Sequence, residues 1–501
     1  MQHHHINRRA FLLGLSAFFV APLRAFASAT QRLFKVPVSD AHVGNLEVDT
    51  KLLDSYGRLP DHIRQFYLDA RAVFEADSNA DFTDPKIVAA AKYHGLALMS
   101  GPMLGDVRSD GTTVWIRPAS KQALTLEVGE AGQAISKTIV VESPQPGVEQ
   151  RIRIDGLTPQ TTYAYAIHAD DTRVAGGTFI TAPDHDQPCN ASLTFGSCFH
   201  KIGLHNPNLI GQILKREPTA MVMYGDLAVD DRNNQVNMHR ADYQLRDVSR
   251  AWRDLAGNVP MYASWDDHDY FDNDLSGIPS KFQAHDRDAL RGIWHQNWNN
   301  PPADPGRKGI YFSTRIGPVE LIMLDTRSCR DNDRRNQYGS YLGSPQMAWL
   351  KQTLLRSTAP FKVITSGTMW SDYISNGKDS WGTWDKQARE ELFAMIGREN
   401  VTGVLLVSGD RHGARAFKIP RETGYDLYEF EPATLGGIRG PRGLADDQTH
   451  QLFGYDGKDF IAFGEFTFDT TQDDPSVTFR LIHETGKIME EHTLLLSQLS
   501  G

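Results

Sequence analysis

The sequence predicts a mixed α/β (α+β) protein in which a small β-sandwich precedes a larger α/β domain. Residues 101–182 form short alternating runs separated by turn residues, as in an antiparallel sandwich. Beyond residue 183, short apolar strands alternate with helical stretches, as in an α/β sheet. The chain has 501 residues, 40% of them apolar, which is too long for one ordinary core, so we expect separate lobes.

Residues 1–29 are predicted to be a twin-arginine export signal. Arg8 and Arg9 precede an apolar run to Pro22, and small residues at 25–29 suit a signal peptidase. We therefore expect the precursor to meet the twin-arginine export machinery and the mature protein to be periplasmic or secreted. The apolar run is too short for a bilayer, and no later stretch reaches about 20 apolar residues, so we expect no transmembrane anchor.

Residues 30–98 are predicted to be a helical extension. Apolar residues recur near a 3.6-residue period from residue 49, and Pro85 is suited to the first position of a further helix. We interpret these helices as a brace for a neighbouring lobe.

Charge and cysteine content exclude some classes of protein. A net charge of −10 argues against a general nucleic-acid-binding surface. The three cysteines are too few for a disulfide framework, and their odd number leaves at least one thiol unpaired. We expect a monomer.

Residues 99–183 are predicted to be a β-sandwich similar to fibronectin type III domains. Seven short strands fit that size of domain. Leu157, Thr158 and Pro159 precede Tyr163 at the start of a strand, which resembles the segment where such domains place a corner tyrosine.

Residues 190–498 are predicted to be the α/β domain. Its apolar strands are expected at 193–195, 221–224, 261–263, 319–324, 362–365 and 404–407. Helices are expected at 286–294, 345–356 and 386–396, and closing antiparallel strands at 460–469, 476–482 and 489–496.

Acidic residues, a thiol and imidazoles follow these strands, most densely in residues 265–273. Ligands of α/β sheets bind at the carboxyl ends of the strands, and clustered carboxylates repel one another unless a cation neutralises them. We therefore interpret the cluster as a metal site; the alternative for residues 265–273 alone is a solvated acidic loop. A carboxylate shared by two ions is what a two-metal phosphoryl-transfer site needs.

Three motifs carry a family resemblance: residues 195–198 (Phe-Gly-Ser-Cys), residues 265–269 with Asn273, and residues 408–412 (Ser-Gly-Asp-Arg-His). In this order behind a β-sandwich, they resemble the alkaline phosphatase D (PhoD-like) branch of the calcineurin-like metallophosphoesterases. The resemblance implies a four-layer α/β sandwich. It also implies hydrolysis of phosphoric esters, of the alkaline phosphatase or phosphodiesterase type, with a metal-bridging hydroxide as the nucleophile.

The resemblance also implies two or more metal ions, iron and calcium, and six metal ligands: Cys198, Asp226, Asp267, Asn273, Asp410 and His412. Asp226 would bridge both ions, and Cys198 would bind the first in place of the Asp-x-His found elsewhere in the superfamily. From the residues alone, a small buried apolar side chain is the favoured interpretation of Cys198.

His268 and Arg327 are the predicted catalytic residues. His268 would donate a proton to the leaving group, or else only orient Asp267 or Asp269 by a hydrogen bond. Arg327 would bind phosphate oxygens, or else form a plain ion pair with Asp325.

One residue departs from the family pattern. The family places a tyrosine ligand of iron three residues after the bridging aspartate, where this chain has Val229. Either Asp230 or Asp231 reaches the site, or the first metal has one protein ligand fewer, or that metal is not iron.

Two other functions remain open from the sequence. The same metals could serve a phosphotriesterase or a phospholipase-like diesterase. A non-catalytic periplasmic binding protein with a decayed metal site is the alternative from another class.

Overall fold

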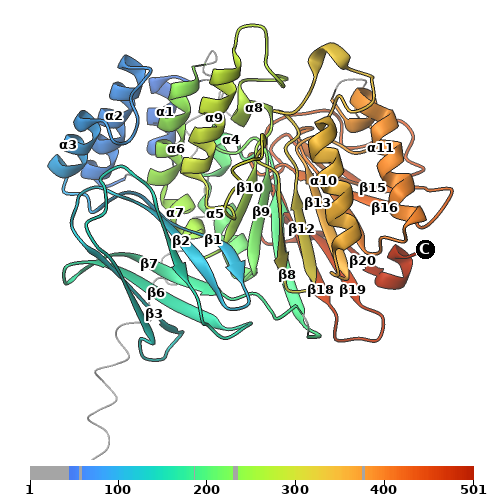
Figure 1. Ribbon diagram of the computed structural model, residues 1–501, viewed down its shortest axis with the longest axis horizontal. Helices are drawn as coiled ribbons and strands as arrows, with labels where there is room; N and C mark the ends of the chain where they lie inside the picture. The colour runs from blue at the N-terminus through green and yellow to red at the C-terminus, as the bar shows by residue number, and fades with distance from the viewer. Residues whose placement is uncertain (1–43, 56–58, 186, 230–234, 375–378) are drawn as a thin grey trace, which may run out of the picture.

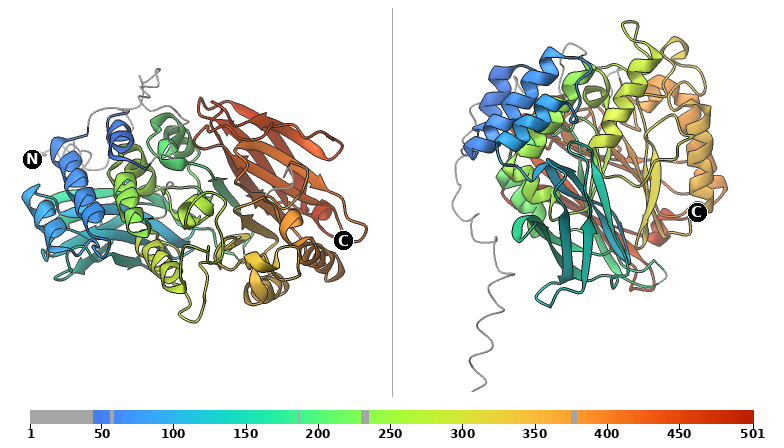
Figure 2. Two further views of the ribbon diagram at one scale, coloured as in Figure 1. Left: turned by 90° about the horizontal axis from the view of Figure 1, so that it is seen from above. Right: turned by 60° about the vertical axis from the view of Figure 1, so that its left-hand side comes forward.

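The computed structural model describes residues 44–55, 59–185, 187–229, 235–374 and 379–501. The predicted export signal, the first part of the helical extension, and Asp230 and Asp231 lie outside the described residues. Figure 1 shows the whole arrangement, and Figure 2 shows it from two further sides.

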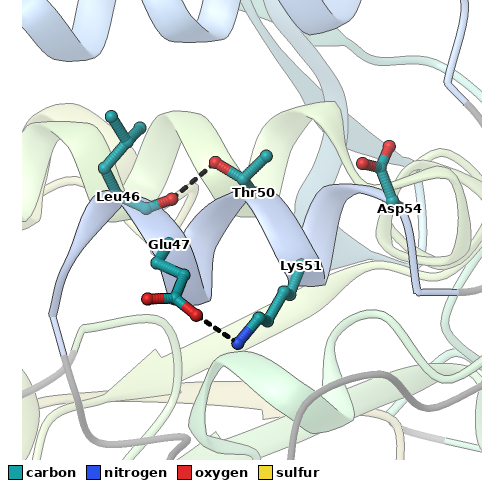
Figure 3. A pocket seen from close by; sticks show the side chains of 5 residues that line it. All are labelled: Leu46, Glu47, Thr50, Lys51 and Asp54. Carbon is teal, nitrogen blue, oxygen red and sulfur yellow. Dashed lines mark hydrogen bonds and ion pairs between the residues drawn. The ribbon is translucent and has the colours of Figure 1, made fainter.

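The predicted N-terminal helices are confirmed as α1 (Leu46–Leu53), α2 (Asp61–Ala76) and α3 (Pro85–Tyr93). The Asn45 side chain caps α1 by accepting a hydrogen bond from the backbone of Val48 (2.9 Å). The inner face of α1 is buried. Its outer face lines a shallow hollow, in which Lys51 and Glu47 form an ion pair (2.5 Å; Figure 3). α1 is therefore amphipathic and packs through one side only.

The seven strands expected in residues 99–183 are present. They are β1 (Leu98–Arg108), β2 (Gly111–Pro118), β3 (Leu124–Glu130), β4 (Lys137–Val141), β5 (Gln150–Ile154), β6 (Thr162–Ala169) and β7 (Thr172–Ile180). β1, β2 and β5 lie side by side, and β4, β3, β6 and β7 form a separate sheet. Apolar residues of both groups form one core between them. The Tyr163 hydroxyl accepts a hydrogen bond from the backbone of Thr158 (3.0 Å).

The β1–β2–β5 strands are not a separate lobe, in contrast to the expectation from chain length. β1 pairs in parallel with β10 (Met261–Ser264) at Gly105 and Met261, so these strands extend the central sheet. The Asn299 side chain adds hydrogen bonds to the carbonyls of Met103 and Thr113, both 2.9 Å long. Backbone pairing thus joins the sandwich to the α/β region.

Two large sheets form the α/β region. The first has nine strands in the order β20-β19-β18-β8-β9-β10-β1-β2-β5, and the second has seven in the order β11-β12-β13-β14-β16-β15-β17. The remaining strands are β8 (Asn190–Gly196), β9 (Ala220–Tyr224), β11 (Phe312–Ile316), β12 (Val319–Met323), β13 (Phe361–Ser366), β14 (Val404–Ser408), β15 (Gly413–Ile419), β16 (Leu427–Ala433), β17 (Gln451–Asp456), β18 (Ala462–Asp469), β19 (Ser476–His483) and β20 (Ile488–Leu495).

The helices of this region are α4 (His200–Gly203), α5 (Pro207–Lys215), α6 (His239–Val248), α7 (Arg250–Ala256), α8 (Asp267–Tyr270), α9 (Ala284–Asn297), α10 (Gly343–Arg356) and α11 (Trp381–Arg398). The expected helices and strands are all among these elements. Strands β11, β15, β16 and β17 and helices α4, α5, α6, α7 and α8 were not predicted.

Alternate residues of β9 face different cores. Ala220 and Val222 join a cluster that contains strands of both sheets, whereas Met221 and Met223 join a cluster with α5, α7 and α9. Helices α10 and α11 pack beside the second sheet (Figure 1). The two sheets are thus stacked face to face, with helices on their outer sides. Among the described residues, no helix is long and apolar enough to cross a membrane.

Candidate metal centre

The carboxyl ends of six strands converge at one edge of the stacked sheets. β8, β9 and β10 are parallel neighbours in the first sheet, and β12, β13 and β14 are parallel neighbours in the second. Most of the predicted ligands follow these strands directly. The sheet topology therefore brings together side chains that lie far apart in the sequence.

The first donor cluster contains Cys198, His200, Asp226 and His412, whose ligand atoms all lie within 4.8 Å of one another. The two histidine Nε2 atoms are 3.0 Å apart. Asp226 Oδ2 lies 3.5 Å from Cys198 Sγ, 4.0 Å from His200 Nε2 and 3.9 Å from His412 Nε2. Donors on one tetrahedral ion at about 2.0 to 2.3 Å are roughly 3.3 to 3.8 Å apart. The separations here, from 3.0 to 4.0 Å, scatter around that range, so small shifts of the side chains would let one ion bind all four atoms.

The second group of donors shares members with the first. Asp226, Asp267 and His268 converge within the same limit, as do Asp266, Asp267 and Asp410. Asp226 thus belongs to two clusters. His268 is buried and its ring lies 5.2 Å from that of His200.

The loops that carry the donors adopt unusual backbone conformations. Cys198, His200, Asp226, Asp410 and His412 all have positive φ, between 41° and 70°. Such conformations cost of order 1 kcal/mol or more each and persist only where surrounding contacts enforce them.

Asp269 supplies some of these contacts. Its carboxylate accepts hydrogen bonds from the backbone of Leu227 (3.0 Å) and Ala228 (3.2 Å), directly after Asp226. Asp269 therefore fixes the loop that presents the shared carboxylate.

The orientation of His412 is set from outside the cluster. Its Nδ1 lies 3.2 Å from the backbone oxygen of Arg439. A proton on Nδ1 would be donated to that carbonyl, which leaves the lone pair of Nε2 directed at the donor cluster.

Arg327 lies among the carboxylates and is fully buried. Its guanidinium contacts Asp266 twice (2.5 and 2.8 Å) and Asp379 once (2.8 Å). It also lies 3.7 Å from Asp267 and 3.5 Å from Asp410. Arg327 therefore holds the acidic residues together.

The expected alternative, an ion pair between Arg327 and Asp325, is wrong, because the guanidinium pairs with Asp266 and Asp379. Asp325 instead accepts hydrogen bonds from the Trp265 indole (2.8 Å) and from the backbone of Ile310 and Ser328.

Burial strongly disfavours the anionic forms of the donors. Burial and the neighbouring carboxylate of Asp267 raise the pKa of Asp226 well above its usual value. The pKa of Asp410 is raised for the same two reasons, and burial beside Asp226 raises the pKa of the Cys198 thiol. Burial also acts on Asp267, but the charges of Arg327 and His268 outweigh it and lower the pKa. Bound cations would stabilise all of these anions.

Unpaired oxygen atoms show that the residues suit metal ions. Among the described residues, Asp226 Oδ1, Asp267 Oδ1 and Asp410 Oδ2 are buried without a hydrogen-bond partner. Buried carboxylate oxygens almost always have a partner, so three unpaired oxygens in one cluster indicate a site for cations.

Two predicted positions lie elsewhere. Asn273 is exposed and its side chain donates to Asp274 (3.0 Å), so it does not lie among the buried donors. Val229 is fully buried in the apolar cluster beneath α5, α7 and α9.

Three residues of the centre were missed by sequence reasoning. His200 could have been found, because the spacing Cys198-x-His200 matches that of the Asp-x-His pair mentioned above. Asp266 stood in the acidic stretch but received no role. Asp379 follows no strand and offers no sequence signal.

Comparisons with known proteins agree with this architecture. Residues 217–436 match the family of PhoD-like phosphatases, and residues 96–186 match a domain of unknown function (DUF7800). Alkaline phosphatase D of Bacillus subtilis (strain 168) is 23% identical over 403 residues, covering 66% of this chain and 67% of that protein.

Two solved structures share the fold. A structure of PhoD superposes with a TM-score of 0.61 at 19% identity, covering 79% of this chain and 92% of that one. The purple acid phosphatase PPD1 of yellow lupin (Lupinus luteus) seeds has a TM-score of 0.55 at 13% identity, covering 79% and 74%.

The fold, the clustered donors and the family match together define a phosphoester hydrolase. More narrowly, the part of the chain that matches a known enzyme family, residues 217–436, resembles the PhoD-like phosphatases.

Proposed function

We propose that the protein is a metal-dependent hydrolase of phosphate esters with a two-metal centre at the strand ends. The observation that carries this proposal is Asp226, whose carboxylate belongs to two donor clusters and keeps one buried oxygen unpaired. When bound there, two cations would activate a water molecule for attack and neutralise charge on the phosphoryl group.

The donor types favour different ions in the two clusters. A thiolate with two imidazoles, from Cys198, His200 and His412, suits iron or zinc. The carboxylates of Asp266, Asp267 and Asp410 suit a hard cation such as calcium. The proposed iron and calcium pair is compatible with this division, with His200 as an additional donor to the first ion.

Protein side chains contribute the remaining chemistry. We infer that His268, buried beside Asp226 and Asp267, donates a proton to the leaving oxygen. Arg327 is engaged by carboxylates on several sides, which favours a role in positioning Asp266 over direct binding of phosphate.

The finer organisation of the chain is also a proposal. A fibronectin III-like module at residues 99–183 is supported by two sheets around one core and by the Tyr163 hydrogen bond. A four-layer metallophosphoesterase domain at 190–498 is supported by the stacked sheets with outer helices. The arginine pair and apolar run of residues 1–29 support export by the twin-arginine route.

The exchange Asp226→Asn tests the proposal, because it removes the shared charge with little change of shape. We expect a folded protein with at least a hundredfold lower kcat and a loss of bound metal, measured by p-nitrophenyl ester hydrolysis and elemental analysis. Asp304→Asn, at an exposed loop, serves as the control. Near-normal turnover by Asp226→Asn would contradict the two-metal centre. In a separate experiment, the rates of the wild type on mono-, di- and triesters distinguish the phosphatase from the diesterase and triesterase alternatives.

A further inference from the structure

Helices α1 and α2 lie outside both matched regions, yet they contact the segment that carries the first donor cluster. The link is Lys201, which directly follows His200 and is only 1% exposed. Its ammonium group lies 2.8 Å from Asp49 Oδ1 in α1 and 3.5 Å from Asp242 in α6. A buried ammonium needs such partners, so α4 is fastened to α1 through this contact.

Asp49 is held in turn by α2. Its second oxygen accepts hydrogen bonds from the Tyr67 hydroxyl (3.0 Å) and from Arg71 Nε (3.1 Å). Asp49 is fully buried, and its carboxylate has donors on both oxygens. A neutral amide could not satisfy them, because its NH₂ group would face another donor.

Apolar packing provides a second, independent link to the same cluster. Val48, Leu52 and Leu53 of α1 share a core with Ile202 of α4 and with Ile438. Ile438 precedes Arg439, whose carbonyl oxygen faces His412 Nδ1. The two N-terminal helices therefore support the segments of both histidine donors.

The backbone of His200 explains why such support matters. Its φ of 41° is unfavourable for a residue with a side chain. Its N–H donates to the Asp226 carbonyl (2.8 Å), which fixes the segment on one side. The ion pair between Lys201 and Asp49 fixes it on the other, so the imidazole is held toward Cys198 and His412.

We propose that Asp49 is a positioning residue of the first metal site, so that the N-terminal helices are part of the metal-binding structure and more than a brace. This inference rests on the proposed two-metal centre. Partners that orient metal ligands typically change affinity about ten- to hundredfold when removed.

Cobalt(II) titration of the metal-free, full-length protein provides the test. Cys198 should give the wild type a thiolate-to-cobalt absorption band, which Cys198→Ser abolishes. We expect Asp49→Asn to raise the Kd reported by this band about ten- to hundredfold and to change the visible d–d bands, with little change in the binding of a second equivalent. The matched control is Asp54→Asn, because Asp54 also links α1 to α2, through Arg64 (3.3 Å), but the two residues are more exposed.

Each result is decisive. An unchanged cobalt Kd in Asp49→Asn, or an equal loss in Asp54→Asn, would overturn the positioning role. If Asp49→Asn does not fold, Asp242→Asn decides by the same titration, since it contacts the same ammonium group at the longer distance. Absence of the band in the wild type would instead refute the first metal site of the proposed function.

Discussion

His268 is the residue whose proposed role makes the clearest kinetic prediction. A proton donor matters most when the leaving group is a poor one, such as an alkoxide, and least for p-nitrophenolate. We expect His268→Gln to lower kcat/KM for alkyl phosphates about a hundredfold or more beyond its effect on p-nitrophenyl phosphate. Steady-state rates on both substrates measure the difference. Equal losses would assign His268 an orienting role only.

Buried carboxylates predict how the metal-free protein responds to pH. Burial raises the pKa of Asp269 to about 7 and that of Asp266 to about 6, and it also raises the pKa values of Asp226 and Asp410 well above their usual range. The native state then binds more protons than the unfolded state, so stability falls as pH rises from about 4 through 7. Urea unfolding in chelator should give a lower free energy at pH 8 than at pH 5. Metal-saturated protein should not show this decline, since bound cations keep the donors ionised.

The sequence identified most of the metal donors but not His200, which completes the first donor cluster. Cys198, Asp226, Asp267, Asp410 and His412 follow apolar strands, and a strand end is visible in sequence. The position of Val229 suggested a missing ligand, although the spacing Cys198-x-His200 already offered another donor. That His200 turns toward the same point is visible only in the structure. Left-handed backbone at His200 is set by tertiary contacts and has no signature in the chain.

Two glycines differ in the space around them, one at the centre and one on helix α5. A Cβ on Gly367, after β13, would lie 2.2 Å from Asp266 Oδ1 and 2.6 Å from Thr326 Oγ1. Gly367→Ala should therefore displace Asp266, weaken metal binding and lower kcat at least tenfold. Gly211 in α5 has no atom within 4 Å of such a Cβ, so Gly211→Ala should stabilise the fold by about 0.5–1 kcal/mol. Chemical unfolding and metal titration of both variants check the contrast.

Two of the strands that escaped prediction, β15 and β16, carry buried charges. In β15 and β16, Arg415 and Glu431 are fully buried and paired (2.9 Å). Glu429, also buried, accepts hydrogen bonds from Trp370 and Ser408. Charged residues at interior positions break the apolar pattern on which strand prediction depends. The strands β9 and β14 contain no charged residue, and their bounds were anticipated closely.

For the whole molecule, the extended central sheet predicts cooperative unfolding. Asn299 is buried and ties β1 and β2 to the segment after α9 by two hydrogen bonds. Asn299→Ala removes both hydrogen bonds and should cost about 1–3 kcal/mol. The exchange should lower the midpoint of a single unfolding transition. Circular dichroism and loss of activity, measured in parallel, should report the same midpoint. Separate transitions for the sandwich and the α/β region would mean that the joined sheet does not couple them.

The place of β18 in the first sheet constrains the order in which the protein matures. β8, which presents Cys198, lies between β9 and β18, and β18 comes from residues 462–469. Until the ribosome has synthesised β18, one edge of β8 has no partner strand. His412 also leaves the ribosome late, long after β8. Contacts between such distant segments form late. The cations would therefore enter a nearly finished fold, so that metal uptake concludes folding and does not nucleate it.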